Sequence, residues 1–263
     1  MRQSQLWDAA AISDRGRLRR NNEDSVLCDP LRHLFAIADG MGGHASGEIA
    51  SRLAIDIAYQ YLRQTPLTLD APTRLRAAFE CANAAVLERS RSCDLFAGMG
   101  TTLLIATLTE LHESKPDTHE AVMHYAHVGD SRLYLVRDGE FILLTRDHTV
   151  AQWWVDNGLC SANEARASSG AHRLTRAIGM DDDLAVEIGH CISTPGDLFL
   201  LCSDGLTHEL DDEQIAACCR RAWQAGDSAD SLCRQLVELA NEAGGRDNIS
   251  VLVVHHCDTA KYA

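Results

Sequence analysis

Aspartates that directly follow short apolar runs are the residues of this sequence best suited to chemistry. The apolar run at residues 34–38 leads into Asp39-Gly40, and later runs lead into Asp130 and Asp204. Glycine beside an aspartate lets the backbone turn sharply and leaves carbonyl oxygens uncovered, because glycine has no Cβ. These oxygens could hold a hard divalent cation, with His44 nearby as a proton donor. Asp-Gly is also an ordinary turn signal, so a plain turn is the alternative.

The same arrangement recurs five times along the chain, each time at the end of a predicted strand or in the loop beside it. The five residues are Asp24, Asp39, Asp130, Asp204 and Asp247. Loops at one end of a sheet sandwich converge, and carboxylates gathered there repel one another unless a cation compensates them. Oxygen ligands without a Cys or His cluster favour Mg²⁺ or Mn²⁺ over zinc. The alternative is that each aspartate only caps its own turn.

Composition limits the other possibilities. The chain has 263 residues, enough for one large domain (residues 1–263), and its formal net charge of -14 makes nucleic acid an unsuitable partner. No apolar run is long enough to span a bilayer, and the N-terminal residues lack the apolar core of a signal peptide. We therefore expect a cytoplasmic protein without a membrane partner, whose ten scattered cysteines are reduced thiols, most of them buried.

Periodicity predicts the elements that position the aspartates. Apolar residues repeat every four positions over residues 46–63, and a second helix begins near Pro72. Strands follow, two of them joined by an Asp138-Gly139 hairpin, before helices at 211–222 and 229–243 and a last strand at 249–254. Helices segregated from strands predict the α+β class, with an antiparallel β-sandwich flanked by helix pairs in α-β-β-α layers.

Residues 146–183 break this regular pattern and predict a mobile flap. A short helix around residues 150–157 is followed by small and polar residues without clear periodicity. Trp153 and Trp154 in that helix are predicted to pack the flap against the body of the protein.

Seven short motifs occur in one order along residues 13–254. They are Arg19-x-x-Asn22-Glu23-Asp24, residues 39–44, Gly100-Thr101-Thr102, residues 128–132, the segment 174–179, Ser203-Asp204-Gly205 and Asp247-Asn248. Together they resemble the PPM-type, or type 2C, metal-dependent serine/threonine protein phosphatases of the bacterial kind. The resemblance implies hydrolysis of phosphoserine and phosphothreonine on proteins by a water activated between two divalent cations, Mn²⁺ or Mg²⁺.

The resemblance also implies a role for each matching position. Asp39 would bridge the two central cations, the carbonyl of Gly40 would hold the second, and Asp204 and Asp247 would complete the shell of the first. Glu23 and Asp24 would lie beside the second cation and act largely through water. Asp130 would join Asp204 at a third, weaker cation site.

Two further positions would act on the substrate. Arg19 would hold the substrate phosphate, because a planar, permanently charged guanidinium suits that anion. His44 would be the general acid that protonates the leaving oxygen. The alternatives are that Arg19 belongs to a solvated charge run and that His44 caps the following helix. The other histidines lack ligand spacing and are interpreted as surface or structural residues.

Three functions remain open at this point. The first is a phosphatase whose partners are phosphorylated proteins, such as a Ser/Thr kinase or its targets, a choice that rests on family resemblance. The second is a hydrolase of small phosphate esters, which would share all of the chemistry. The third is an inactive family member that binds phosphoproteins, although every expected ligand position here retains its carboxylate.

Overall fold

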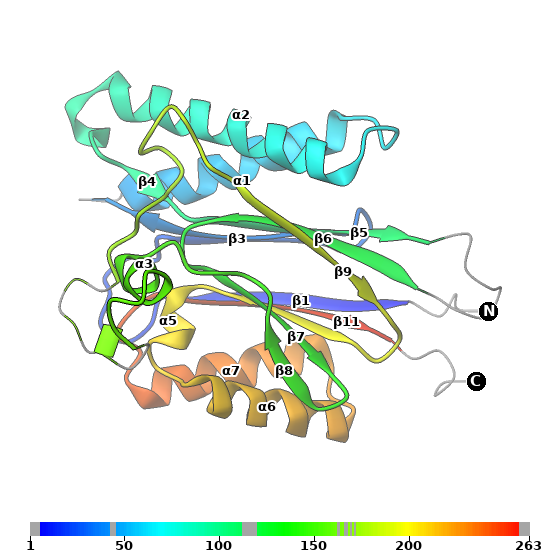
Figure 1. Ribbon diagram of the computed structural model, residues 1–263. Coiled ribbons are helices and arrows are strands. Elements are labelled where there is room, and N and C mark those ends of the chain that lie inside the picture. The colour runs from blue at the N-terminus through cyan, green and yellow to red at the C-terminus, as the bar shows by residue number, and fades with distance from the viewer. Residues whose placement is uncertain are drawn as a thin grey trace.

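The computed structural model describes residues 6–42, 46–111, 120–161, 164–165, 168, 170 and 172–257. Two antiparallel sheets lie face to face in these residues (Figure 1). The first contains, in spatial order, β1 (Trp7–Asp14), β11 (Ile249–His256), β10 (Leu198–Cys202), β7 (Arg132–Arg137) and β8 (Glu140–Leu143). The second contains β2 (Asp24–Asp29), β3 (Leu34–Met41), β5 (Leu103–Glu110), β6 (Ala121–Val128) and β9 (Glu187–Ser193), with β4 (Gly100–Thr101) paired to the end of β3.

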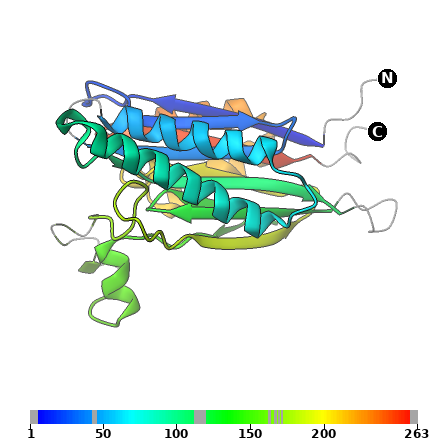
Figure 2. The same cartoon turned by 90° about the horizontal axis from the view of Figure 1, so that it is seen from above.

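A pair of helices covers the outer face of each sheet (Figures 1 and 2). The second sheet is covered by α1 (Ser46–Gln64) and α2 (Ala71–Ser92), and the first by α6 (Asp212–Ala225) and α7 (Ala229–Ala243). The shorter helices are α3 (Val150–Asp156), α5 (Asp204–Thr207) and a 3-10 turn at Asp94–Phe96. The predicted α-β-β-α layering is therefore confirmed.

Strict alternation of side chains along the strands produces three apolar layers. In β10, Phe199 and Leu201 point into the layer between the two sheets, whereas Leu200 points toward α6 and α7. In β3, Phe35 and Ile37 likewise enter the layer between the sheets, while their neighbours face α1 and α2. Because side chains alternate between the faces of a strand, a continuous apolar run can serve two layers at once.

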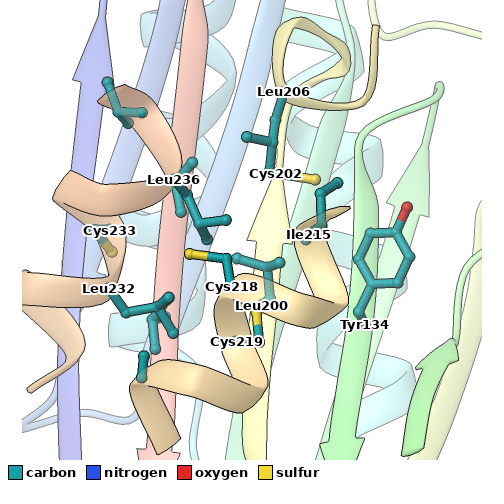
Figure 3. Packing of buried hydrophobic residues seen from close by; sticks show 14 of the residues in the cluster. Tyr134, Leu200, Cys202, Leu206, Ile215, Cys218, Cys219, Leu232, Cys233 and Leu236 are labelled. Carbon is teal, nitrogen blue, oxygen red and sulfur yellow. The ribbon is translucent and has the colours of Figure 1, made fainter. Parts of the chain in front are cut away.

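The cysteines are part of this packing and not a framework of cross-links. All ten are free. Cys218, Cys219 and Cys233 lie among leucines between the first sheet and its helices (Figure 3), and burial raises the pKa of each of these thiols. Four of the ten are fully buried, four are half-buried and two are exposed. Fewer of the cysteines are deeply buried than predicted.

Turn chemistry fixes the sandwich at its edges. Asp138 and Gly139 join β7 to β8 with φ of 51° and 85°, the left-handed pair that a two-residue hairpin requires. Pairing of Trp7 with His256 places the start of β1 and the end of β11 together. The loops after β3, β6 and β10 gather at the opposite end, beside α3 and α5 (Figure 1).

No helix in the described parts of the chain combines the length and apolarity needed to cross a bilayer.

Candidate metal centre and active site

One cavity of about 360 Å³, the central cavity, lies at this loop end of the sandwich. Seven of the nine predicted site residues line it: Arg19, Glu23, Asp39, Gly40, Asp130, Asp204 and Asp247. They come from the loop after β1, from β3 and from the segments that follow β6, β10 and α7. The fold thus brings together carboxylates that lie more than 200 residues apart in the sequence.

Hydrogen bonds from the neighbouring strand hold the backbone of Asp39. Its N–H donates to Oγ1 of Thr102 at 2.8 Å, and its carbonyl accepts from Thr101 Oγ1 at 2.8 Å and from the N–H of Thr102 at 2.9 Å. Thr102 Oγ1 also lies 2.8 Å from Oγ of Ser131, the residue after Asp130. These threonines, which belong to the Gly100-Thr101-Thr102 motif, orient the central carboxylate of the site.

Close backbone packing explains the glycine that follows Asp39. A Cβ on Gly40 would lie 2.1 Å from the carbonyl oxygen of Gly47 and 2.6 Å from that of Glu23, so no side chain fits. The N–H of Gly40 donates to this Glu23 carbonyl at 3.1 Å. The start of α1, the end of β3 and the loop carrying Glu23 are therefore fixed against one another.

Asp24 differs from the other carboxylates because it lies behind the cavity. It is directly opposite Asp39 in the β2–β3 pairing and is only 8% exposed. Its Oδ2 accepts hydrogen bonds from Ser203 Oγ at 2.8 Å and from Ser250 Oγ at 2.6 Å, whereas its buried Oδ1 has no hydrogen-bond partner. Ser203, which belongs to one of the sequence motifs, and Ser250, which does not, thus hold this carboxylate.

Asn248 connects the two ends of the chain at the site. Its side-chain oxygen accepts from the N–H of Glu23 at 2.8 Å, and its amide donates to the carbonyls of Arg15 and Asn21, both at 2.9 Å. A Cβ on Gly205 would lie 1.9 Å from the carbonyl oxygen of Asn248, so α5 packs directly on this segment. The sequence motif contained Asn248 but gave no indication of this role.

Crowding of buried acids raises the pKa values in the cavity. Burial, followed by the nearby charges of Asp24, Asp204 and Asp130, raises the pKa of Asp39 well above its ordinary value. Burial and the charges of Asp204 and Asp147 do the same to the pKa of Asp130. Burial, opposed by the two serine hydrogen bonds, raises the pKa of Asp24 to about 7. The protein alone therefore does not stabilise this set of carboxylates in the charged form.

The donor set suits hard divalent cations. Oδ1 of Asp204 is buried without a hydrogen-bond partner, as is Oδ1 of Asp24. A buried carboxylate oxygen without a partner is unfavourable, and a cation would satisfy it and reverse the pKa shifts. The cavity offers carboxylate and carbonyl oxygens, the ligands that Mg²⁺ and Mn²⁺ prefer. The residues present fit the cations expected from the sequence.

Arg19 supplies positive charge at the rim of the cavity. Its side chain is 51% exposed, and Nη2 lies 2.5 Å from Oδ2 of Asp247. An exposed guanidinium beside a cluster of carboxylates can meet an arriving anion without first being freed from the protein core. His44, the predicted proton donor, lies outside the described residues.

Two other histidines, His172 and His208, lie near the carboxylates, and both are exposed, in agreement with their interpretation as surface or structural residues. Nδ1 of His208 is 3.4 Å from Oδ2 of Asp204, and Nε2 of His208 is 3.0 Å from Nδ1 of His172. His172 belongs to the flap and lines the central cavity. Their spacing in the sequence carries no signal of this proximity, because it depends on how the flap folds back on α5.

A second cavity of about 730 Å³, the side cavity, adjoins the central one and shares Asp130, Asp204 and Asp247 with it. Flap residues, among them Gln152 and Val155 of α3, line one side, and the segment from α5 to α6 lines the other. A substrate group seated at the carboxylates could therefore extend into a much larger space beside the flap.

Carboxylate and carbonyl oxygens at one end of an α-β-β-α sandwich are the arrangement expected of the metal-dependent phosphatases that the motifs resemble. Residues 19–241 match the family model described as Protein phosphatase 2C. The chain belongs to this family.

Similar proteins from bacteria agree in sequence. The serine/threonine protein phosphatase PstP of Mycobacterium tuberculosis (strain ATCC 25618 / H37Rv) is 38% identical over 250 residues, which cover 95% of this chain and 45% of PstP. This chain thus spans a little under half the length of that relative. Protein phosphatase PhpP of Streptococcus pneumoniae (strain ATCC BAA-255 / R6) is 31% identical over 255 residues, which cover 94% of this chain and 96% of PhpP.

Solved structures agree in fold. The crystal structure of M. tuberculosis PstP/Ppp superimposes with a TM-score of 0.83 at 34% identity, covering 96% of this chain and 99% of that one. The catalytic domain of PstP in complex with two manganese ions gives a TM-score of 0.81 at 35% identity, with the same coverage. The fold class and the family predicted from the sequence are confirmed. The PstP complex contains the number and type of cation predicted for the central pair.

Proposed function

We propose that this protein hydrolyses phosphoserine and phosphothreonine in other proteins with the help of divalent cations. The observation that carries the proposal is the convergence of Asp39, Asp130, Asp204 and Asp247 on one cavity, where Oδ1 of Asp204 is buried without a hydrogen-bond partner. Membership of the protein phosphatase 2C family supports the same reaction. No cysteine or serine nucleophile is required.

The proposed roles combine the family resemblance with the position of each side chain. Asp39, the carbonyl of Gly40, Asp204 and Asp247 would hold two cations, which when bound would supply Lewis acidity and lower the pKa of water. Asp130 would hold a third cation with Asp204, and Glu23 and Asp24 would act from the β2 side. Arg19 binds the phosphate, because its exposed guanidinium can offer two parallel donors.

His44 donates a proton to the leaving oxygen in this proposal. We expect His44→Gln to lower kcat, about 10²-fold, and to remove the alkaline limb of the pH–rate profile, because glutamine cannot supply the proton. His190→Gln, an exposed histidine on β9, is the control. An unchanged alkaline limb in His44→Gln would leave His44 as a helix cap.

A comparison of substrates tests the reaction itself. We expect a phosphothreonine peptide and p-nitrophenyl phosphate to be hydrolysed only with Mn²⁺ or Mg²⁺, with the peptide preferred over nucleotides. A preference for nucleotides or other small esters would instead support the second function considered above. Binding of phosphopeptide without turnover would support the inactive family member.

The biological setting is part of the proposal. A Ser/Thr kinase or its targets are the proposed substrates, and the cytoplasm is the proposed location, in keeping with ten free cysteines. The flap (residues 146–183) is proposed to move and to admit the protein segment that carries the phosphate into the side cavity. Phosphoproteomics of cells with and without the protein, paired with in vitro Mn²⁺ titration on the hits, checks the substrate.

A further inference from the structure

Three titratable side chains meet outside the proposed catalytic site, at the root of the flap. His127 lies in β6, His148 lies between β8 and α3, and Glu187 begins β9 directly opposite His127. Their nearest ligand atoms all lie within 4.8 Å of one another, close enough to suggest a metal ion. The rings of His127 and His148 stack with their centroids 4.7 Å apart.

The direction of the hydrogen bonds argues against a cation there. The N–H of Gly129 donates to Nδ1 of His148 at 3.1 Å, so the neutral ring carries its proton on Nε2. That Nε2 lies 3.2 Å from Oε2 of Glu187, to which it donates. A metal at Nε2 would move the proton to Nδ1, where it would face the N–H of Gly129. The charged guanidinium of Arg176, 3.3 Å from Nε2, further disfavours a cation.

The backbone of His148 adds two more connections. Its N–H donates to the carbonyl of Gly129 at 3.0 Å, and its carbonyl accepts from the N–H of Thr175 at 2.8 Å. His148 is thus joined to the loop after β6, to the returning end of the flap and to β9. The residue is buried, so water competes little for these bonds.

This position connects two parts of the proposed active site. Gly129 immediately precedes Asp130, and a Cβ on Gly129 would lie 2.5 Å from Cγ2 of Thr102, the threonine that orients Asp39. The flap leaves the body around His148 and returns at Thr175. One imidazole therefore lies between the loop that places Asp130 and both ends of the flap.

We propose that His148 is a positioning residue and that its two ring nitrogens hold two different parts of the protein in place. Nδ1 fixes the loop that presents Asp130 to its cation, and Nε2, through Glu187, fixes the flap against β9. The inference rests on the proposed function, because it takes Asp130 as a ligand of the third, weaker cation.

Two substitutions separate the two nitrogens. In His148→Asn, the side-chain oxygen can replace Nδ1 as acceptor for Gly129, but nothing reaches Glu187. In His148→Gln, the longer amide can reach Glu187, but the bond from Gly129 is lost. We expect His148→Gln to raise the Mn²⁺ concentration for half-maximal activity about tenfold, the effect of losing one buried hydrogen bond. His190→Gln, an exposed histidine further along β9, is the matched control.

The second readout is amide hydrogen exchange of the flap, which needs neither substrate nor cation. We expect His148→Asn to exchange about tenfold faster at residues 148–157 and 172–176, with a raised KM for phosphopeptide and an unchanged KM for p-nitrophenyl phosphate. Glu187→Ala should reproduce this flap effect without disturbing the core, because its side chain is 44% exposed.

Failure of the proposed function and failure of the proposed role of His148 would give different results. Wild-type protein that hydrolyses nothing with Mn²⁺ would overturn the proposed function, while the exchange experiment would still test the connection to the flap. Active wild-type protein, with Asn and Gln variants that change both readouts equally or neither, would overturn the positioning role of His148. So would Glu187→Ala with flap exchange like that of the wild type.

Discussion

The carboxylate cluster and the flap line adjoining cavities, yet they are held in opposite ways. Asp39 lies at the end of a strand paired on both sides, with three hydrogen bonds to its backbone. The flap helix α3 contains no buried residue, and it stands away from the sheets and the long helices (Figure 2). The groups proposed to hold cations are therefore rigidly placed, whereas the side wall of the substrate space has few supports.

This difference suggests a division of labour. Cations need ligand atoms fixed to a fraction of an ångström, so the carboxylates belong on strand ends and short turns. A protein substrate varies in sequence around its phosphate, so the wall that meets it benefits from being adjustable. Changes in the cluster should therefore abolish the reaction, and changes in the flap should alter which substrates are used.

The most severe test of the rigid region is Asp39→Asn. We expect turnover of p-nitrophenyl phosphate to fall by about 10³-fold or more, because the amide removes a charge that both central cations share. Calorimetric titration with Mn²⁺ should show weaker binding in parallel. Asp138→Asn, at the β7–β8 hairpin, is the matched control and should be unaffected, because asparagine also accepts the left-handed conformation there. Near-normal turnover in Asp39→Asn would contradict the bridging role.

The same crowding should make the metal-free protein sensitive to pH. The pKa values of Asp24, about 7, and of Asp39 and Asp130 lie above the ordinary value near 4 of an unfolded chain. Between about pH 4 and pH 7 the folded state therefore binds more protons than the unfolded state. The free energy of unfolding must then fall as the pH rises through this window.

Denaturation in the presence of a chelator, at pH 5 and pH 7.5, measures this effect. We expect a loss on the order of 3 kcal/mol on going to the higher pH, and recovery with Mn²⁺. Asp24→Asn should flatten the dependence, because its amide does not titrate. A metal-free protein that gains stability toward pH 7.5 would show that these carboxylates do not share a buried site.

Substitution of Arg19 should have an effect on activity smaller than that of Asp39→Asn and larger than that of a change in the flap. We expect Arg19→Ala to raise the KM for phosphopeptide by about 10- to 100-fold with little change in Mn²⁺ binding, because a guanidinium–phosphate contact is lost while the carboxylates remain. Arg20→Ala, the exposed neighbour in the same basic run, is the control. Equal effects of the two substitutions would favour the solvated charge run over a phosphate contact.

The α-β-β-α layers and the aspartates at the ends of strands could be predicted from the sequence, because both depend on local signals. Alternating apolar residues, the Asp138-Gly139 turn and the four-residue repeat of α1 each act over a few positions. Helix ends were also predictable where caps exist: α6 begins after the Asp211 capping box and ends at Ala225, three residues beyond the predicted end, with Gly226 as its C-cap.

The side chains that contact the site residues could not be predicted, because these contacts join distant segments and local sequence patterns do not encode them. Ser203 and Ser250 hold Asp24 only because β10 and β11 lie beside β2, and His172 reaches His208 only through the path of the flap. The prediction that Trp153 and Trp154 both pack the flap on the body was wrong for Trp153, whose side chain is 54% exposed, whereas Trp154 is half-buried. Hydrophobicity indicated burial, but no residue of α3 is fully buried.

That exposed tryptophan gives the mildest test of the flap. We expect Trp153→Ala to change the free energy of unfolding by less than about 0.5 kcal/mol, because little of its surface is removed from water. The KM for phosphopeptide should rise about two- to fivefold if the indole meets the substrate, with turnover of p-nitrophenyl phosphate unchanged. Trp223→Ala, a half-exposed tryptophan of α6 remote from both cavities of the site, is the matched control. A loss of activity on both substrates would instead indicate that Trp153 helps to hold the carboxylates in place.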